Sequence, residues 1–219
     1  MPRIPSFHSL SLLAGALLVG VAGARHPLLS GDGAAQLGAI AAASGWRGIH
    51  LALVFGMILV VAGLVGVALR HGETAGSAAV RAGILLGVLG YGLALVGVLF
   101  MTGSAARLAE TYAAAQPSLT ATEAVFVFDM LRPFATMALR AGEFAIGLSI
   151  WSFGWGVVDG RLLPSWIGWL GVLAGVVCAV WAVVMNEHAA MLMGGLALVT
   201  VWQVVVAGVM VAAEVRGAR

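Results

Sequence analysis

Long segments without any charged residue constrain the fold of this chain more than any other feature. Residues 82–106, 162–186 and 188–213 each contain no Asp, Glu, Lys or Arg. A helix needs about 20 mostly apolar residues to cross the hydrocarbon core of a bilayer. The chain is 62% hydrophobic and 9% charged, whereas soluble domains are about 25% charged. The sequence therefore predicts an all-α, polytopic membrane helix bundle. Its unbroken apolar runs differ from the short alternating segments of a membrane β-barrel.

Six membrane helices are expected within one domain covering residues 1–219. The first helix follows Arg3 and ends at Ala22-Gly23-Ala24. Such small residues are also found at signal-peptide cleavage sites. We interpret this segment as a first membrane helix that the protein retains. Three connections are short enough to predict antiparallel hairpins between spans two and three, four and five, and five and six. The expected spans are about 9–24, 48–70, 80–103, 134–158, 164–185 and 189–212.

The two long connections, 25–47 and 104–133, are expected to carry one short helix each. Ser30-Gly31-Asp32 can cap a helix over residues 34–43. Thr120-Ala121-Thr122-Glu123 matches a capping box that opens a second helix, ending near Leu131. Pro133 is expected to break or kink the chain before span four. The sequence thus predicts two helical flaps over one face of the bundle.

The arginines predict an orientation. All eleven basic residues are arginine, which together with the abundant Ala, Gly and Val favours a bacterial inner-membrane protein. The positive-inside rule then places both termini in the cytoplasm and both long loops outside. In that orientation the inner side holds six arginines: Arg3, Arg70, Arg81, Arg161, Arg216 and Arg219. The outer side holds four: Arg25, Arg47, Arg107 and Arg132.

The composition also indicates which classes of binding partner to expect. The arginines form no basic stripe, so nucleic acid is not an expected partner. The single cysteine, Cys178, excludes an internal disulfide and a cysteine-based metal cluster. Membrane lipids are the expected partners, and a homo-oligomer is compatible with the sequence. Two stripes of small residues predict close helix packing: Gly83, Gly87, Gly90, Ala94 and Gly97, and Gly168, Gly171, Gly175, Ala179 and Ala182.

Two charged residues, Arg140 and Glu143, interrupt span four. Excluding both would leave residues 144–158, which are too few to cross the bilayer. Residues three and four apart share a helix side, so both lie on one face with Thr136, Gly147 and Trp151. One interpretation is an internal ion pair that fixes helix packing. The other is a functional site, in which Glu143 donates or accepts a proton and Arg140 positions an anionic group.

A second group of polar residues is expected at the outer end of the bundle. His50 begins span two, while Asn186, Glu187 and His188 form the turn before span six. These residues are expected to line the mouth of a pocket above Glu143. Asp129 is expected at a similar depth, and Trp181 is a candidate for the apolar wall of the pocket. His50 and His188 are also candidate metal or haem ligands. No HExxH or CxxCH motif supports a specific cofactor, and His8, His26 and His71 receive no role.

One stretch resembles a known group of proteins. Residues 161–175, RLLPSWIGWLGVLAG, are similar to a hairpin in small six-span bacterial membrane proteins of unknown function. The stretch consists mostly of turn and packing residues. The resemblance therefore implies a fold and carries no catalytic residues with it.

The preferred hypothesis is an intramembrane pocket that binds a lipophilic small molecule, a lipid or isoprenoid, and supports acid–base chemistry with Glu143 and Arg140. Such a ligand can reach the pocket from the bilayer. Three alternatives remain open at this stage: a proton-coupled small transporter, a structural or accessory subunit of a membrane complex, and a metal- or haem-binding protein using His50 and His188. The sequence does not decide whether the protein is an enzyme.

Overall fold

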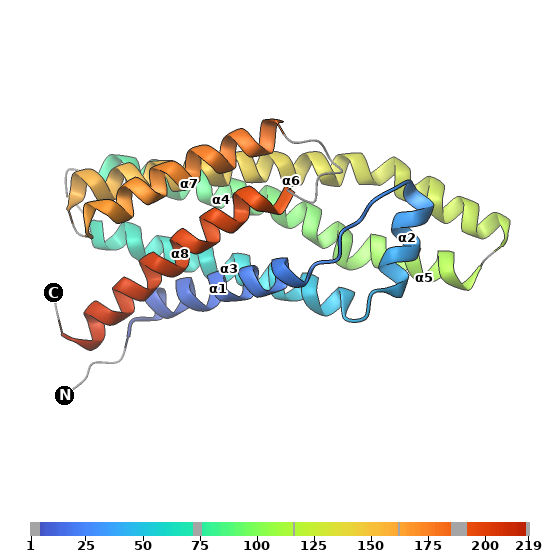
Figure 1. The fold of residues 1–219 in the computed structure, drawn as a ribbon, viewed down its shortest axis with the longest axis horizontal. Helices are drawn as coiled ribbons and strands as arrows, with labels where there is room; N and C mark the ends of the chain where they lie inside the picture. The colour runs from blue at the N-terminus through green and yellow to red at the C-terminus, as the bar shows by residue number, and fades with distance from the viewer. Residues whose placement is uncertain (1–4, 72–75, 116, 162, 185–191, 218–219) are drawn as a thin grey trace.

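The computed structural model describes residues 5–71, 76–115, 117–161, 163–184 and 192–217, and nearly all of them are helical, with no strand in these ranges (Figure 1). The elements in chain order are α1 (Phe7–Arg25), α2 (Gly33–Ala42), α3 (Trp46–His71), α4 (Ser77–Phe100), the π-helical turn η1 (Met101–Ala105), α5 (Ala106–Ala114), α6 (Leu119–Gly160), α7 (Ser165–Val184) and α8 (Leu192–Val215).

Within the described ranges, six segments are long and apolar enough to cross a membrane, which confirms the predicted helical membrane bundle. They are α1, α3, α4 with its continuation through α5, α6, α7 and α8. Each predicted span coincides with one of these segments. The chain therefore has the architecture of a multi-pass integral membrane protein.

The membrane helices form a closed ring, because each packs mainly against two others in the order α1, α3, α4, α6, α7, α8 and back to α1. The three predicted hairpins correspond to the neighbouring pairs α3–α4, α6–α7 and α7–α8. Apolar side chains from all six membrane helices are fully buried in the core of the ring; they include Leu12, Val60, Ala94, Ile146, Ile167 and Trp202.

Both predicted stripes of small residues pack against α6, on two different sides. A methyl group added at Gly142 would lie 2.6 Å from the backbone nitrogen of Ala94 in α4. One added at Gly147 would lie 2.5 Å from the backbone nitrogen of Ala179 in α7. The helix backbones touch at these points, as small residues allow. This close packing fixes α6 between α4 and α7.

The end of the bundle opposite the chain termini carries a second apolar cluster, which we call the cap (Figure 1). It contains α2, α5 and the first turns of α6. Asp32 begins α2 as predicted, since its carboxylate accepts a hydrogen bond from the backbone N–H of Ala35 at 2.9 Å. The cap core is built from Leu37, Ile40, Trp46, Ala105, Ala106, Ala109, Ala124 and Phe128.

The prediction of a long loop and a separate flap over residues 104–133 is wrong. The chain stays helical from Ser77 to Ala114, and α6 runs unbroken through Pro133. The N-cap of α6 is Ser118 rather than the predicted capping box at Thr120. Proline removes one backbone hydrogen bond and often ends a helix, but here the Phe128 side chain anchors the preceding turns in the cap. The predicted outer helix and span four are thus one helix.

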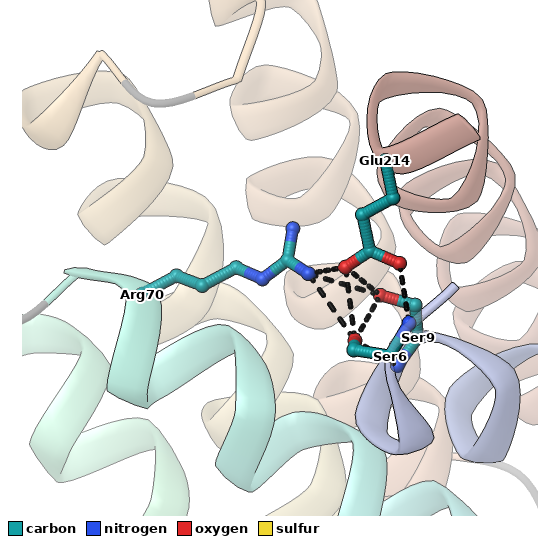
Figure 2. Close-up of polar contacts among 4 residues, drawn as sticks. All are labelled: Ser6, Ser9, Arg70 and Glu214. Atoms are coloured by element: carbon teal, nitrogen blue, oxygen red, sulfur yellow. Dashed lines mark hydrogen bonds and ion pairs between the residues drawn. The ribbon is translucent and has the colours of Figure 1, made fainter. Parts of the chain in front are cut away.

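At the end of the ring that lies away from the cap, a compact polar cluster connects the helices (Figure 2). The Glu214 carboxylate near the end of α8 forms an ion pair with Arg70 of α3. It also accepts hydrogen bonds from the Ser6 backbone N–H at 2.7 Å and from the Ser9 hydroxyl at 3.0 Å. We call these four residues the termini clasp, because they join the start of α1 to the ends of α3 and α8.

Candidate functional site

A polar stripe runs along one face of α6. Arg132, Thr136, Arg140 and Glu143 follow one another at spacings of four, four and three residues, so they lie above one another on one side of the helix. Glu143 is 2% exposed, while the other three side chains are partly buried. The structure therefore places two guanidinium groups and one carboxylate on the same face, and Arg132 joins the pair predicted from the sequence.

Several polar atoms in this stripe are buried without a hydrogen-bond partner. They are Nε of Arg132, Nε and Nη2 of Arg140, and Oε1 of Glu143. Among the described residues, Arg140 and Glu143 form no ion pair with each other or with a third group. Buried polar groups in native proteins nearly always have a partner, and an exception calls for an explanation such as a water, an ion or a ligand.

The stripe enters the membrane from the cap end. The backbone carbonyl of Glu143 accepts a hydrogen bond from the Cys178 thiol of α7 at 3.5 Å. Cys178 lies six residues before the end of α7 at Val184, which corresponds to about 9 Å of helix. Since α7 has 20 residues, about enough to cross the hydrocarbon core, Glu143 lies well inside that core. Arg140 lies nearly one turn closer to its edge.

The structure separates Asp129 from Glu143. The two residues are fourteen positions apart on one helix, which corresponds to about 21 Å. Asp129 is exposed, and its carboxylate lies against Gly33, the first residue of α2. A carboxylate is favourable at that position because a helix N-terminus carries partial positive charge. Asp129 therefore belongs to the cap and does not line a site at Glu143.

His50 also lies apart from the α6 stripe. Its ring contacts are with His26 and Trp46, on the α1–α3 side of the ring. Trp181 lies where α7 crosses α8, with its indole close to Gly194. The predicted mouth residues Asn186, Glu187 and His188 lie outside the described residues. Of the predicted site, the described residues place only Arg140 and Glu143 together.

A histidine pair that the sequence analysis missed joins the ring to the cap. The Nε2 atoms of His26 and His50 are 3.2 Å apart. His50 Nδ1 donates to the Trp46 carbonyl at 2.9 Å, and the Trp46 indole donates to the Met101 carbonyl of η1 at 2.8 Å. Burial lowers the pKa of the His26 imidazole, and a hydrogen bond with the Pro27 backbone opposes that shift.

One further polar contact lies deep in the ring. The Gln203 amide of α8 donates to the Tyr91 hydroxyl of α4 at 2.5 Å, and both side chains are buried. This bond links two helices that are not neighbours in the ring order. Both groups have a partner, so unlike the α6 stripe this pair offers no free polar atom that a ligand would satisfy.

An open pocket of about 280 Å³ lies on the cap, outside the α6 stripe. This is slightly below the range of about 300–1,000 Å³ that is usual for small-molecule sites, and neither Arg140 nor Glu143 lines it. Within the described ranges, no three or more His, Cys, Asp or Glu side chains gather closely enough to hold a metal ion. The pocket is lined by Ile40, Ala41, Ala43, Gly45, Trp46, Arg47, Gly48, Ala106 and Glu110.

Comparisons with protein-family models, with curated proteins and with solved structures found no match for this chain. The resemblance of residues 161–175 to small six-span proteins therefore has no support from a family match.

Proposed function

We propose that this protein binds a lipophilic small molecule of the lipid or isoprenoid class, with its polar head against the α6 stripe. The observation that carries the proposal is the set of unpartnered buried atoms on Arg132, Arg140 and Glu143. A charge at this depth in the membrane is costly and is usually retained for function. A bound head group would give each of these atoms the partner that the protein itself does not provide.

The charges on the stripe favour an anionic head. Two guanidinium groups and one carboxylate leave a net charge of +1 when all three are ionised, so a monoanionic head would neutralise the site. Arginine suits phosphate and carboxylate oxygens because its N–H groups form a fork. A head that also carries a hydroxyl would donate to Oε1 of Glu143. A phosphate monoester in its monoanionic form supplies both kinds of oxygen.

The surroundings of Arg140 favour access from the bilayer. Met137 and Phe144, on either side of it along α6, are 58% and 41% exposed, and in a membrane such side chains face lipid. Arg140 itself is partly exposed although Nε and Nη2 are buried. A lipid tail would lie along this apolar surface while its head reaches the stripe. After binding, we propose acid–base chemistry at Glu143, in which its carboxylate exchanges a proton with the hydroxyl of the head group.

Lipid co-purification tests the binding step. The protein is purified in a mild detergent, and bound lipids are identified by native mass spectrometry and by extraction with liquid chromatography. We expect one anionic amphiphile per chain in the wild type. Arg140→Gln or Glu143→Gln should reduce its occupancy by about ten-fold or more, because a hydrogen bond to a charged group contributes about 1.5–3 kcal/mol.

Matched controls exist on the surface of the same chain. Glu123→Gln changes an exposed carboxyl on α6, and Arg81→Gln changes an exposed arginine on α4; both should retain the bound molecule. A wild-type protein without a bound amphiphile, or equal losses in the control variants, would exclude the proposal. Proton flux into liposomes that disappears in Glu143→Gln while lipid occupancy is unchanged would favour the transporter alternative.

A further inference from the structure

The junction between the ring and the cap holds a second convergence of polar atoms, independent of the α6 stripe. His26 directly follows α1, and His50 lies in the second turn of α3. Their rings approach with Nε2 atoms 3.2 Å apart and centroids 4.9 Å apart. His50 is 2% exposed. Two imidazoles, one just after α1 and one on α3, thus meet at one point.

Both rings also have a hydrogen-bond partner on the backbone. His50 Nδ1 has the Trp46 carbonyl at 2.9 Å, so it carries a proton. His26 has a hydrogen bond with the Pro27 backbone, and because proline has no N–H the partner is the Pro27 carbonyl. The two Nε2 atoms face each other at hydrogen-bonding distance. Either a proton donated by one ring or a bound cation can lie between the two nitrogens.

We propose that His26 and His50 form a binding site for one divalent transition-metal ion of the Zn²⁺ type. Two Zn–N bonds of 2.0–2.1 Å at a tetrahedral angle hold their nitrogens about 3.3 Å apart, close to the observed 3.2 Å. Metal-binding histidines usually donate their other ring N–H to a carboxylate or a backbone carbonyl. The Trp46 and Pro27 carbonyls supply this second layer of contacts.

The surrounding residues hold the two ligands in place. The Trp46 ring lies 4.2 Å from the His50 ring and 5.2 Å from the His26 ring, measured between centroids. Its indole N–H is fixed by the Met101 carbonyl at the π-helical turn η1. With two ligands from the described residues, the ion keeps coordination positions for water or a small ligand. A bound ion would link the end of α1 to the start of α3 beneath the cap.

Metal titration of the purified full chain tests the site. Zn²⁺ affinity is measured by competition with a chromophoric chelator, and Cu²⁺ is used as a spectroscopic probe because copper binds nitrogen sites more tightly than zinc. We expect one ion per chain and pulsed electron paramagnetic resonance signals from two imidazole nitrogens. His26→Gln and His50→Gln should each weaken Zn²⁺ binding by at least about ten-fold and reduce the copper signal to one imidazole.

His8→Gln is the matched control. His8 lies on α1 and is bonded through Nδ1 to the Ala62 carbonyl at 2.9 Å, so its loss should leave metal binding unchanged. Circular dichroism and gel filtration confirm that each variant is folded, and the copper spectrum of the wild type needs no variant at all. No uptake by the wild type at millimolar metal, or ¹⁵N spectra showing only a proton shared between the two rings, would overturn the site. Equal weakening in His8→Gln would overturn it as well.

Discussion

The termini clasp and the α6 stripe both contain arginine and glutamate, and the two places differ in how their polar atoms are satisfied. In the clasp, Glu214 bonds to Arg70, Ser6 and Ser9, and these contacts join three helices (Figure 2). On the stripe, Glu143 is more deeply buried, yet its Oε1 has no partner, and neither have two nitrogens of Arg140. The stripe lies within one helix, and these unpartnered atoms connect it to no other helix.

The difference separates a structural role from a binding role. A buried or half-buried charge stabilises a fold when its hydrogen-bonding capacity is filled, and it destabilises the fold when that capacity is left empty. The clasp belongs to the first class. The stripe belongs to the second, and its cost to the apo protein is what a bound head group would offset.

The largest expected effect comes from the packing that holds the stripe in place. Gly147 lies one turn after Glu143, and a methyl group there would lie 2.5 Å from the Ala179 nitrogen. Gly147→Ala should therefore lower the free energy of unfolding by about 3 kcal/mol, because overpacking against a rigid backbone forces helices apart. Unfolding by sodium dodecyl sulfate in mixed micelles measures the change.

Gly92→Ala is the control for this effect, since a methyl group at Gly92 would meet no atom within 4 Å. It should be neutral or stabilise by up to about 1 kcal/mol, because alanine is the better helix former. Similar destabilisation by both variants would mean that the α6–α7 contact does not position the stripe.

The next largest effect is expected in the clasp. Glu214→Ala removes the acceptor for Arg70, Ser6 and Ser9 together. The free energy of unfolding should fall by about 2 kcal/mol, a value reduced for the partial exposure of Arg70. Glu123→Ala, at an exposed position of α6, should change it by less than about 0.5 kcal/mol. A clasp variant as stable as that control would show that the cluster is not structural.

Local sequence patterns were sufficient where the structure depends on neighbours in the chain. The apolar runs predicted all six membrane helices, and Asp32 correctly marked the start of α2. The small-residue stripes predicted close packing, which the contacts of Gly142 and Gly147 confirm. Helical periodicity also placed Arg140 and Glu143 on one face. Each of these inferences needs only residues a few positions apart.

Features that depend on distant contacts were not predictable in the same way. Pro133 suggested a break, but α6 continues through it, with Phe128 packed in the cap core before it. His26 and His50 are 24 residues apart and carry no motif, so only the fold brings their rings together. Asp129 matched Glu143 by residue type but lies in the cap, against Gly33. The missing partners of Arg140 are likewise a property of tertiary structure.

Replacing the glutamate of the α6 stripe should not lower the free energy of unfolding, in contrast to replacing Glu214 in the termini clasp. Glu143→Gln replaces a buried carboxyl group whose Oε1 has no partner, so the free energy of unfolding of lipid-free protein should stay equal or rise by about 1 kcal/mol. With the proposed amphiphile bound, wild type should regain the advantage, since a ligand stabilises only the state that binds it. Unfolding is compared before and after delipidation. A loss of more than about 1 kcal/mol in delipidated Glu143→Gln would place the residue with the clasp as a structural group.

The smallest effect on the free energy of unfolding is expected for the exposed ion pair of the cap. Arg47 and Glu110 are 2.9 Å apart, and both side chains are 54% exposed. Ion pairs in water contribute about 0–1 kcal/mol because solvent screens the attraction and ordering two long side chains has an entropic cost. Arg47→Ala should therefore lower stability by about 0.5 kcal/mol or less, and high salt should remove that difference. A larger loss that persists in high salt would mean that Arg47 supports the cap through packing along the pocket it lines rather than through its charge.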